Sequence, residues 1–428
     1  MNKNSVAKTP PMGWNSWDCF GTGVNEEQLL ANAEYMRDNL KEYGWQYIVC
    51  DIQWSEPTAR SCQYHNFAEL YMDEYSRLIP AVERFPSSAN GKGFSVIAKK
   101  IHDMGLKFGI HIMRGIPRQA VHRNTPIKCQ GVSARDIAQQ FSLCSWNTDM
   151  YGVKYGVKGA QEYYDSLIEL YASWGVDFIK VDDICITEAH PNDLYSGKKE
   201  IEMIRKAIDK CGREMVLSLS PGPAMIENAH HLSSNANMWR LTGDFWDKRD
   251  KVNDMFRKCE MWYKFTGEGS WPDCDMLPFG QLRMWEDKDK RPCRLTKEDQ
   301  YTVMNLWSIF RSPLMFGGNM PDNDEFTLSL LTNKDIIEIN QYSSDNRPVV
   351  SESDRAIWTC KDKNKNDIIS FFNLTEKEMS FSMPNEFLHL GTIKLFNLWT
   401  EKEYVCDSGE FQITLKRYDS VIFRISKK

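Results

Sequence analysis

Short apolar runs alternate with longer amphipathic stretches from the N-terminus to about residue 345. The short runs predict strands, and stretches with apolar residues every three or four positions predict helices. The eight predicted strands are Met12–Trp17, Tyr47–Trp54, Phe108–Gly115, Phe178–Ile184, Met215–Pro221, Met238–Asp244, Gly269–Leu277 and Pro313–Gly317. The predicted helices are Glu26–Tyr43, Phe94–Met104, Ala160–Trp174, Lys199–Cys211, Asp250–Phe265, Lys297–Phe310 and Glu325–Gln341. Eight β-α units in series favour a closed TIM (β/α)8 barrel over an open sheet.

The pattern changes after about Ser344, where short apolar runs follow one another closely and polar turns separate them. The runs are Ala356–Cys360, Asp367–Phe372, Met379–Met383, Thr392–Leu398, Phe411–Leu415 and Ser420–Ile425. This spacing predicts antiparallel strands, and about 80 residues suit a small β-sandwich. We therefore expect two domains, a catalytic barrel at residues 1–345 and an antiparallel β-sandwich at residues 346–428.

Polar and aromatic residues stand at the predicted C-terminal ends of the barrel strands, where functional residues of such barrels gather. They are Trp14 and Trp17, Asp51 and Trp54, His111 and Arg114, Lys180 and Asp182, Ser218 and Ser220, Arg240 and Asp244, and Asp273 and Asp275. One such strand end would be an ordinary capping or salt-bridge site, but seven on one rim favour a polar pocket. The polar segment Ile116–Lys158 is predicted to be an extended loop over this rim.

The predicted strand Phe178–Ile184 ends in a lysine and two carboxylates. Side chains two positions apart share a face of a strand, so Lys180 and Asp182 point the same way while Asp183 points away. A neighbouring cation favours the ionised form of Asp182, which can act as a nucleophile or stabilise a cationic transition state. A salt bridge at the strand end is the alternative interpretation.

Composition narrows the class of protein. The net charge is −6 without a long basic run, so we expect no nucleic-acid partner and no binding to an anionic membrane. No apolar run could span a bilayer and the first ten residues lack a signal-peptide core, so a soluble cytoplasmic protein is expected, although a removed export signal would leave no trace. The 12 Cys and 8 His form no metal-binding motif, which favours reduced, mostly buried thiols and leaves disulfides open.

Two carboxylates on different strands, an arginine and several of the 14 Trp on one rim suggest glycoside hydrolysis. That reaction needs one carboxylate near the anomeric carbon and a second carboxyl group that donates and then removes a proton. Asp182 and Asp244 fit these roles by position. The pattern alone does not distinguish them from Asp273 or Asp275.

Six motifs carry a family resemblance. They are Thr9–Trp17, Lys180–Asp182, Trp239–Asp244, Asp273–Leu277, Ser312–Leu314 and Asp335–Gln341. In order and content they resemble glycoside hydrolase family 27, the family of α-galactosidases and α-N-acetylgalactosaminidases. The resemblance implies a retaining double displacement with Asp182 as nucleophile and Asp244 as acid/base, and no cofactor or metal. The residues expected to bind a terminal sugar are Trp14, Asp51, Ile52, Trp54, His111, Lys180, Ser220, Arg240 and Asp275.

One position departs from most α-galactosidases of this family, which carry two adjacent carboxylates at the end of the second strand to grip O4 and O6 of galactose. Here the second position is Ile52. Leaving O6 buried without a partner would cost on the order of 1–3 kcal/mol. β-L-Arabinopyranose has the ring stereochemistry of α-D-galactose without C6, and the β-L-arabinopyranosidases of the family look like this chain at Ile52 and around His111. We therefore expect the pentoside to be preferred.

The sequence leaves other interpretations open. Ile52 could be a core residue behind the site, in an α-galactosidase whose O6 is served by Gln53 or a water. The small Ser220 also suits a 2-acetamido sugar, although that sugar carries O6 as well. The disulfide of the family is not expected, because Ile184 stands where its cysteine would be. A non-catalytic sugar-binding barrel is the non-enzyme alternative, and a homo-oligomer is expected by analogy with other large barrels of the family.

Overall fold

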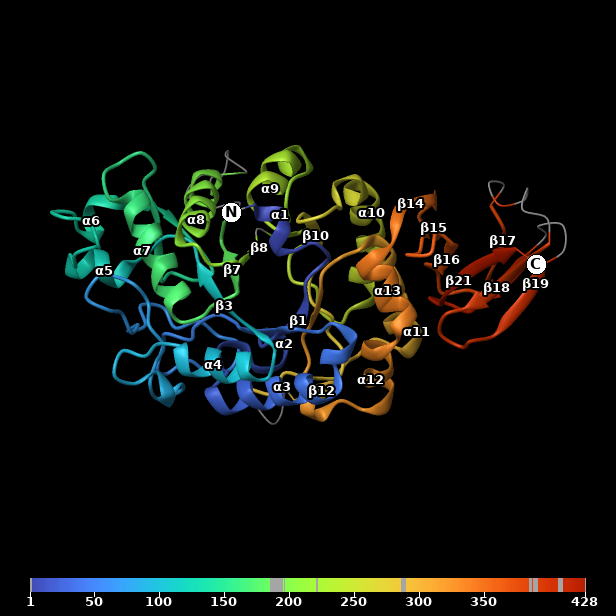
Figure 1. Ribbon diagram of the computed structural model, residues 1–428, viewed down its shortest axis with the longest axis horizontal. Helices are drawn as coiled ribbons and strands as arrows, with labels where there is room; N and C mark the ends of the chain where they lie inside the picture. Colours follow the sequence, from blue (N-terminus) through green and yellow to red (C-terminus); the bar gives the residue numbers. More distant parts are fainter. Residues whose placement is uncertain are drawn as a thin grey trace.

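Eight parallel strands form the barrel of the computed structural model (Figure 1). The structure describes residues 2–184, 195, 197–220, 222–285, 290–384, 387, 392–406 and 411–427. The barrel strands are β1 (Met12–Asn15), β2 (Tyr47–Cys50), β3 (Lys107–Met113), β7 (Phe178–Asp182), β8 (Val216–Ser220), β9 (Met238–Arg240), β10 (Trp271–Asp273) and β13 (Leu314–Phe316). Each lies inside or within one residue of a predicted strand. The predicted strands were too long at their C-terminal ends, because the chain leaves the sheet there to form the rim.

The eight strands close into a barrel. Their order is β10-β9-β8-β7-β3-β2-β1-β13, and the two edge strands meet through Leu277. The Leu277 N–H donates to the Met315 carbonyl at 2.8 Å, and the Leu277 carbonyl accepts from the Gly317 N–H at 3.0 Å. Closure leaves no free sheet edge, and the predicted barrel is confirmed.

Helices surround the strands. They are α1 (Lys3–Val6), α2 (Trp17–Phe20), α3 (Glu26–Asn39), α4 (Ser95–Asp103), α7 (Ala160–Ser173), α8 (Lys198–Cys211), α9 (Ala229–Asn235), α10 (Arg249–Trp262), α11 (Lys297–Phe310), α12 (Glu325–Thr332) and α13 (Lys334–Tyr342). The helix predicted at Glu325–Gln341 is two helices. Asn333 ends α12, and its side chain accepts the Ile336 N–H at 3.0 Å to begin α13.

The segment Ile116–Lys158 is not the extended loop that its polar composition predicts. It contains β4 (Ile116–Pro117), α5 (Arg118–Arg123), α6 (Ala134–Ile137), β5 (Ala138–Leu143) and β6 (Met150–Val153), and the three strands pair in the order β4-β6-β5. Scattered apolar residues such as Val121, Ile127 and Ile137 join the main core. Their spacing follows neither a helical nor a strand period, so the sequence did not predict these elements. A second small ribbon pairs β11 (Gln281–Leu282) with β12 (Arg291–Pro292).

The C-terminal strands form two antiparallel sheets at one end of the molecule (Figure 1). They are β14 (Ser344–Ser351), β15 (Arg355–Lys361), β16 (Asp367–Asn373), β17 (Met379–Ser382), β18 (Ile393–Asn397), β19 (Glu403–Cys406), β20 (Gln412–Leu415) and β21 (Ser420–Lys427). Phe371 packs toward Phe381 of the smaller sheet at 5.8 Å, and Phe372 packs on Phe256 of α10 at 4.9 Å between ring centroids. The larger sheet therefore lies between the smaller sheet and the barrel helices. The polar strands β14 and β19 were not predicted, and the boundary at residues 345/346 stays a prediction.

Candidate active site

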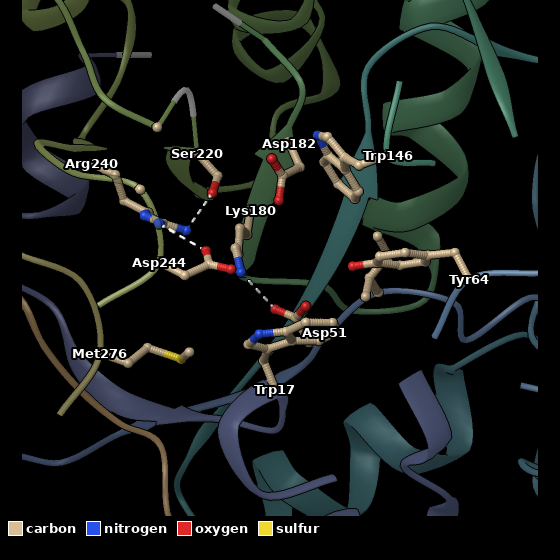
Figure 2. Close-up of a pocket in the computed structure, with 13 residues that line it drawn as sticks. Trp17, Asp51, Tyr64, Trp146, Lys180, Asp182, Ser220, Arg240, Asp244 and Met276 are labelled. Carbon is tan, nitrogen blue, oxygen red and sulfur yellow. Dashed lines mark hydrogen bonds and ion pairs between the residues drawn. The ribbon is translucent and has the colours of Figure 1, made fainter. Parts of the chain in front are cut away.

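A pocket of about 330 Å³ opens at the C-terminal ends of the barrel strands (Figure 2). Its lining residues are Trp17, Asp51, Ile52, Tyr64, Trp146, Lys180, Asp182, Ser220, Gly222, Arg240, Gly243, Asp244 and Met276. Parallel strands direct their C-terminal ends to one rim, so residues distant in sequence converge there. Seven of these residues were predicted from the sequence as part of the sugar site.

Asp51 lies at the floor of the pocket as an ionised hydrogen-bond acceptor. Its Oδ2 accepts from Asn15 Nδ2 at 2.7 Å and from Lys180 Nζ at 2.9 Å. Burial would raise the pKa of Asp51, but the Lys180 ammonium holds it well below its ordinary value. The pair therefore presents a fixed acceptor and a fixed cation to a ligand's hydroxyl groups.

Ile52 lies beside Asp51 in the pocket wall, which strand alternation does not allow. Alternation stops because β2 ends at Cys50 and the chain turns, with Gln53 at a φ of 69°. Ile52 is 4% exposed and packs with Met113 among the small apolar cluster behind the wall. The core interpretation is therefore correct for one face of the side chain only, because the other face lines the pocket.

Gln53 does not serve the pocket, contrary to one alternative raised by the sequence. Its Nε2 donates to Asp149 Oδ2 at 2.7 Å, and the side chain is buried outside the pocket lining. This bond joins the end of β2 to the connection between β5 and β6. An O6 hydroxyl in the pocket would find no partner in Gln53.

Asp182, at the end of β7, is held from two directions. His111 Nε2 lies 3.2 Å from Oδ2, and the Asp183 N–H donates to Oδ1 at 2.8 Å. Burial would raise the pKa of Asp182, but the hydrogen bond from His111 and the positive charges of Lys180 and Arg240 lower it below its ordinary value. Asp183 turns the other way and pairs with Arg114 at 2.9 Å, as alternation predicts. A single ionised carboxylate therefore faces the cavity from this strand.

Arg240, at the end of β9, contacts residues at the ends of β8, β9 and β10. Its guanidinium donates to Ser220 Oγ at 3.1 Å and to Asp244 Oδ1 at 2.9 Å, and it lies 3.3 Å from Asp275 Oδ2. The Asp244 side chain is 56% exposed, whereas the Asp182 side chain is 19% exposed. Asp244 therefore lies nearer the mouth of the pocket than Asp182.

Four predicted sugar-binding residues lie outside the pocket lining. Trp14 is in the core, where its indole N–H donates to the Gly318 carbonyl at 2.8 Å. The Trp54 indole N–H donates to the His111 carbonyl at 2.7 Å, and its ring packs in an aromatic cluster. His111 is buried behind Asp182, and Asp275 is buried behind Arg240. Both contact the lining residues rather than the cavity.

Three aromatic or thioether side chains of the lining were not assigned from the sequence: Tyr64, Trp146 and Met276. Trp146 is 43% exposed. A tryptophan among the polar residues between β5 and β6 is a sequence signal of a binding surface, but it does not say which pocket the ring lines. Trp17, which the sequence places on the rim, lines the pocket in place of Trp14.

Asp273, unlike Asp182 and Asp244, does not line the pocket. It is buried outside the lining, and its Oδ1 accepts the Asp275 N–H at 2.9 Å. Burial, with the nearby charge of Asp275, raises the pKa of Asp273 to about 7. An unfolded aspartate ionises near pH 4. Asp273 therefore binds a proton more tightly in the folded state than in the unfolded state.

Asp273→Asn is expected to change how stability depends on pH. Between about pH 4 and pH 7 the unfolded wild-type chain loses a proton that the folded chain keeps, so its free energy of unfolding falls as the pH rises. Asparagine keeps an oxygen that accepts the hydrogen bond from the Asp275 N–H. Because it does not ionise, the fall in the free energy of unfolding with rising pH should disappear. We expect the variant to be more stable than wild type at pH 8, by up to about 4 kcal/mol, with the difference shrinking toward pH 4. Urea unfolding at pH 5 and pH 8 measures the difference in the free energy of unfolding between the variant and wild type. A difference independent of pH would contradict a protonated Asp273 in the folded state.

The cysteines in the described ranges are free thiols, and Cys259 Sγ lies 3.5 Å from Cys274 Sγ. Cys185, which follows the position of the family's cysteine, lies outside the described residues. Within those ranges no cluster of His, Cys, Asp and Glu is arranged to hold a metal ion. No helix of the same ranges is long and apolar enough to cross a membrane.

Comparisons with known proteins find related sequences and solved structures. A family model described as Alpha galactosidase A matches residues 148–342. A GH27 β-L-arabinopyranosidase from Geobacillus stearothermophilus is 51% identical, and its crystal structure has a TM-score of 0.95 over 100% of this chain and 98% of that chain. A putative α-N-acetylgalactosaminidase from Bacillus halodurans is 49% identical, with a TM-score of 0.87 over 98% of this chain and 97% of that chain. Alpha-galactosidase 2 of Arabidopsis thaliana is 23% identical over 99% of this chain and 91% of its own length.

Proposed function

The chain belongs to glycoside hydrolase family 27, and from this membership we propose that it removes terminal β-L-arabinopyranosyl residues by a retaining double displacement. α-D-Galactosides are weaker substrates in this proposal. The observation that carries it is Ile52 in the pocket wall beside Asp51. The similarity to a β-L-arabinopyranosidase at 51% identity supports the same specificity.

The pocket has a polar part and an apolar part, which suits a pentopyranose (Figure 2). The polar part consists of Asp51, Lys180, Ser220, Arg240 and the two candidate catalytic carboxylates, Asp182 and Asp244. The apolar part includes Trp17, Ile52, Tyr64 and Trp146. β-L-Arabinopyranose carries hydroxyl groups at C2, C3 and C4 and a bare methylene at C5. Ile52 matches that methylene, whereas the hydroxymethyl group of a hexose would leave O6 without a partner against it.

Asp182 is the proposed nucleophile. A carboxylate can only accept hydrogen bonds, so His111 carries its proton on Nε2 in this arrangement. The lowered pKa keeps Asp182 ionised at neutral pH. An oxygen of Asp182 attacks C1, the bond from C1 to the leaving oxygen breaks, and a covalent glycosyl ester forms.

Asp244 is the proposed acid/base. Its position at the pocket mouth lets the carboxyl proton pass to the leaving oxygen in the first step. In the second step the Asp244 carboxylate takes a proton from the water that attacks C1 and releases Asp182. Two displacements on opposite faces of C1 retain the anomeric configuration.

The proposal is tested with three chromogenic glycosides that share one leaving group: β-L-arabinopyranoside, α-D-galactoside and 2-acetamido-α-D-galactoside. We expect the highest kcat/KM for the pentoside. Preference for the galactoside would keep the family mechanism and overturn the pentose assignment. Preference for the 2-acetamido sugar would instead mean that the space beside Ser220 decides specificity.

Ile52→Asp is expected to shift specificity toward the hexose. A carboxylate at this position offers O6 an acceptor, so the ratio of kcat/KM for the galactoside to that for the arabinopyranoside should rise about tenfold or more. Absolute rates fall, because the new charge lies next to Asp51. Ile52→Val, which stays apolar, is the matched control and should leave pentose preference in place. An unmoved ratio in Ile52→Asp would mean that residue 52 does not contact the sugar.

A further inference from the structure

Two segments far apart in the sequence meet on the apolar side of the pocket. Tyr64 comes from the connection that follows β2, and Trp146 comes from the connection between β5 and β6. Their ring centroids lie 5.2 Å apart, and Tyr64 stacks on Trp17 at 6.1 Å with the ring planes 9° apart. We call Tyr64 and Trp146 the aromatic wall.

The aromatic wall is fixed by hydrogen bonds behind it. Gln53 Nε2 donates to Asp149 Oδ2 at 2.7 Å, and the Asp149 N–H donates to Asn147 Oδ1 at 3.0 Å. Thr148 Oγ1 donates to Asn66 Oδ1 at 3.5 Å, which joins the two segments directly. Because Gln53 follows Ile52, the turn that brings Ile52 into the pocket also anchors the segment that carries Trp146.

The chemistry of the pocket orients the sugar against this wall. In the proposed mechanism Asp182 marks C1, and Asp51 faces the far side of the ring. Figure 2 shows Arg240 on one side of the cavity, Tyr64 and Trp146 on the opposite side, and Lys180 between Asp182 and Asp51. Ile52 also belongs to the lining. The C2 and C3 hydroxyl groups accept hydrogen bonds from Lys180 and Arg240 in this orientation. C5 and the ring oxygen then face the aromatic side.

We propose that Tyr64 and Trp146 are specificity-determining residues that close the pocket around C5 and exclude the C6 group of hexopyranosides. This inference rests on the proposed function and deepens it. Ile52 removes the polar partner of O6, whereas the aromatic wall removes the space for C6. Enlarging the pocket and restoring an acceptor are therefore separate requirements for accepting a galactoside.

The experiment measures kcat/KM for the β-L-arabinopyranoside and the α-D-galactoside in Trp146→Ala and Tyr64→Ala. Each variant should raise the hexose-to-pentose ratio about tenfold, the scale expected when a pocket gains room for one additional group. Tyr64→Phe keeps the ring and should keep the wild-type ratio. Phe141→Ala, on β5, and Phe67→Ala are matched controls, because these exposed aromatic residues of the same two segments lie outside the pocket lining. The double variant Ile52→Asp/Trp146→Ala should exceed either single variant.

The outcomes separate this inference from the proposed function. A wild-type enzyme that prefers the galactoside overturns the proposed function and the inference together. A wild-type enzyme that prefers the pentoside, with unchanged ratios in both alanine variants, overturns only the role of the aromatic wall. Thermal unfolding of each variant checks that the variant is folded. If one alanine variant does not fold, Trp146→Phe or Tyr64→Leu takes its place under the same two criteria.

Discussion

Replacing Asp182 by Asn is expected to lower kcat/KM for the preferred glycoside by on the order of 10⁵-fold, as loss of a nucleophile does in other covalent mechanisms. Asparagine has nearly the same volume and keeps an acceptor for the Asp183 N–H, so the fold and the pocket should survive. It cannot form the glycosyl ester. The loss should therefore appear in the chemical step, while the affinity for free L-arabinose changes little.

Two measurements separate a chemical role of Asp182 from a structural one. Unfolding midpoints of wild type and Asp182→Asn should agree closely, and calorimetry should show that L-arabinose still binds. In Asp182→Ala, azide can enter the vacated space and attack C1 from the nucleophile's side. A single displacement then gives a glycosyl azide of inverted configuration. Turnover of Asp182→Asn within about tenfold of wild type would rule out the nucleophile role.

The repeating part of the fold could be predicted from the sequence because its signals are local. Each barrel strand is a short apolar run that ends at the polar rim, and each long helix buries one face; a left-handed glycine follows several of the helices. The sequence predicts a left-handed glycine after five helical runs, and Gly44, Gly105, Gly175 and Gly212 have the positive φ expected there. Gly267, the fifth, does not have a positive φ. The small sheet β4-β6-β5 escaped prediction because its strands are short and partly polar, so pairing depends on partners distant in sequence.

The candidate site could be predicted where a residue's position follows from the strand it ends, or where the family resemblance placed it, as for Ile52 and Asp244. Lys180 and Asp182 obey strand alternation, and both reach the cavity. Trp14 and Trp17 differ because β1 ends at Asn15, so the direction of Trp17 is set by the helix α2 that begins there. Trp146 and Tyr64 could not be assigned to the pocket, because only the three-dimensional path of their segments brings them to the rim.

Replacing Asp244 by Ala is expected to have effects that depend on the leaving group. For a natural disaccharide or another poor leaving group, losing the general acid should lower kcat/KM by about 10²- to 10⁴-fold. For a dinitrophenyl glycoside the leaving oxygen needs little proton donation, so formation of the glycosyl ester should stay fast. Hydrolysis of that ester still lacks its base. The ester should therefore accumulate, and the reaction should show a burst of dinitrophenolate followed by slow turnover.

Azide provides the decisive contrast between the two carboxylates. In Asp244→Ala, azide needs no general base, so it should accelerate turnover of the dinitrophenyl glycoside by attacking the ester on Asp182. Two displacements then give a glycosyl azide of retained configuration, opposite to the product of Asp182→Ala. Asp275→Asn is the control, because Asp275 is a buried carboxyl group that lies 3.3 Å from Arg240 without lining the pocket; its losses should be the same for good and poor leaving groups. An inverted azide from Asp244→Ala would exchange the two roles, since each product records which face of C1 the missing carboxylate occupied.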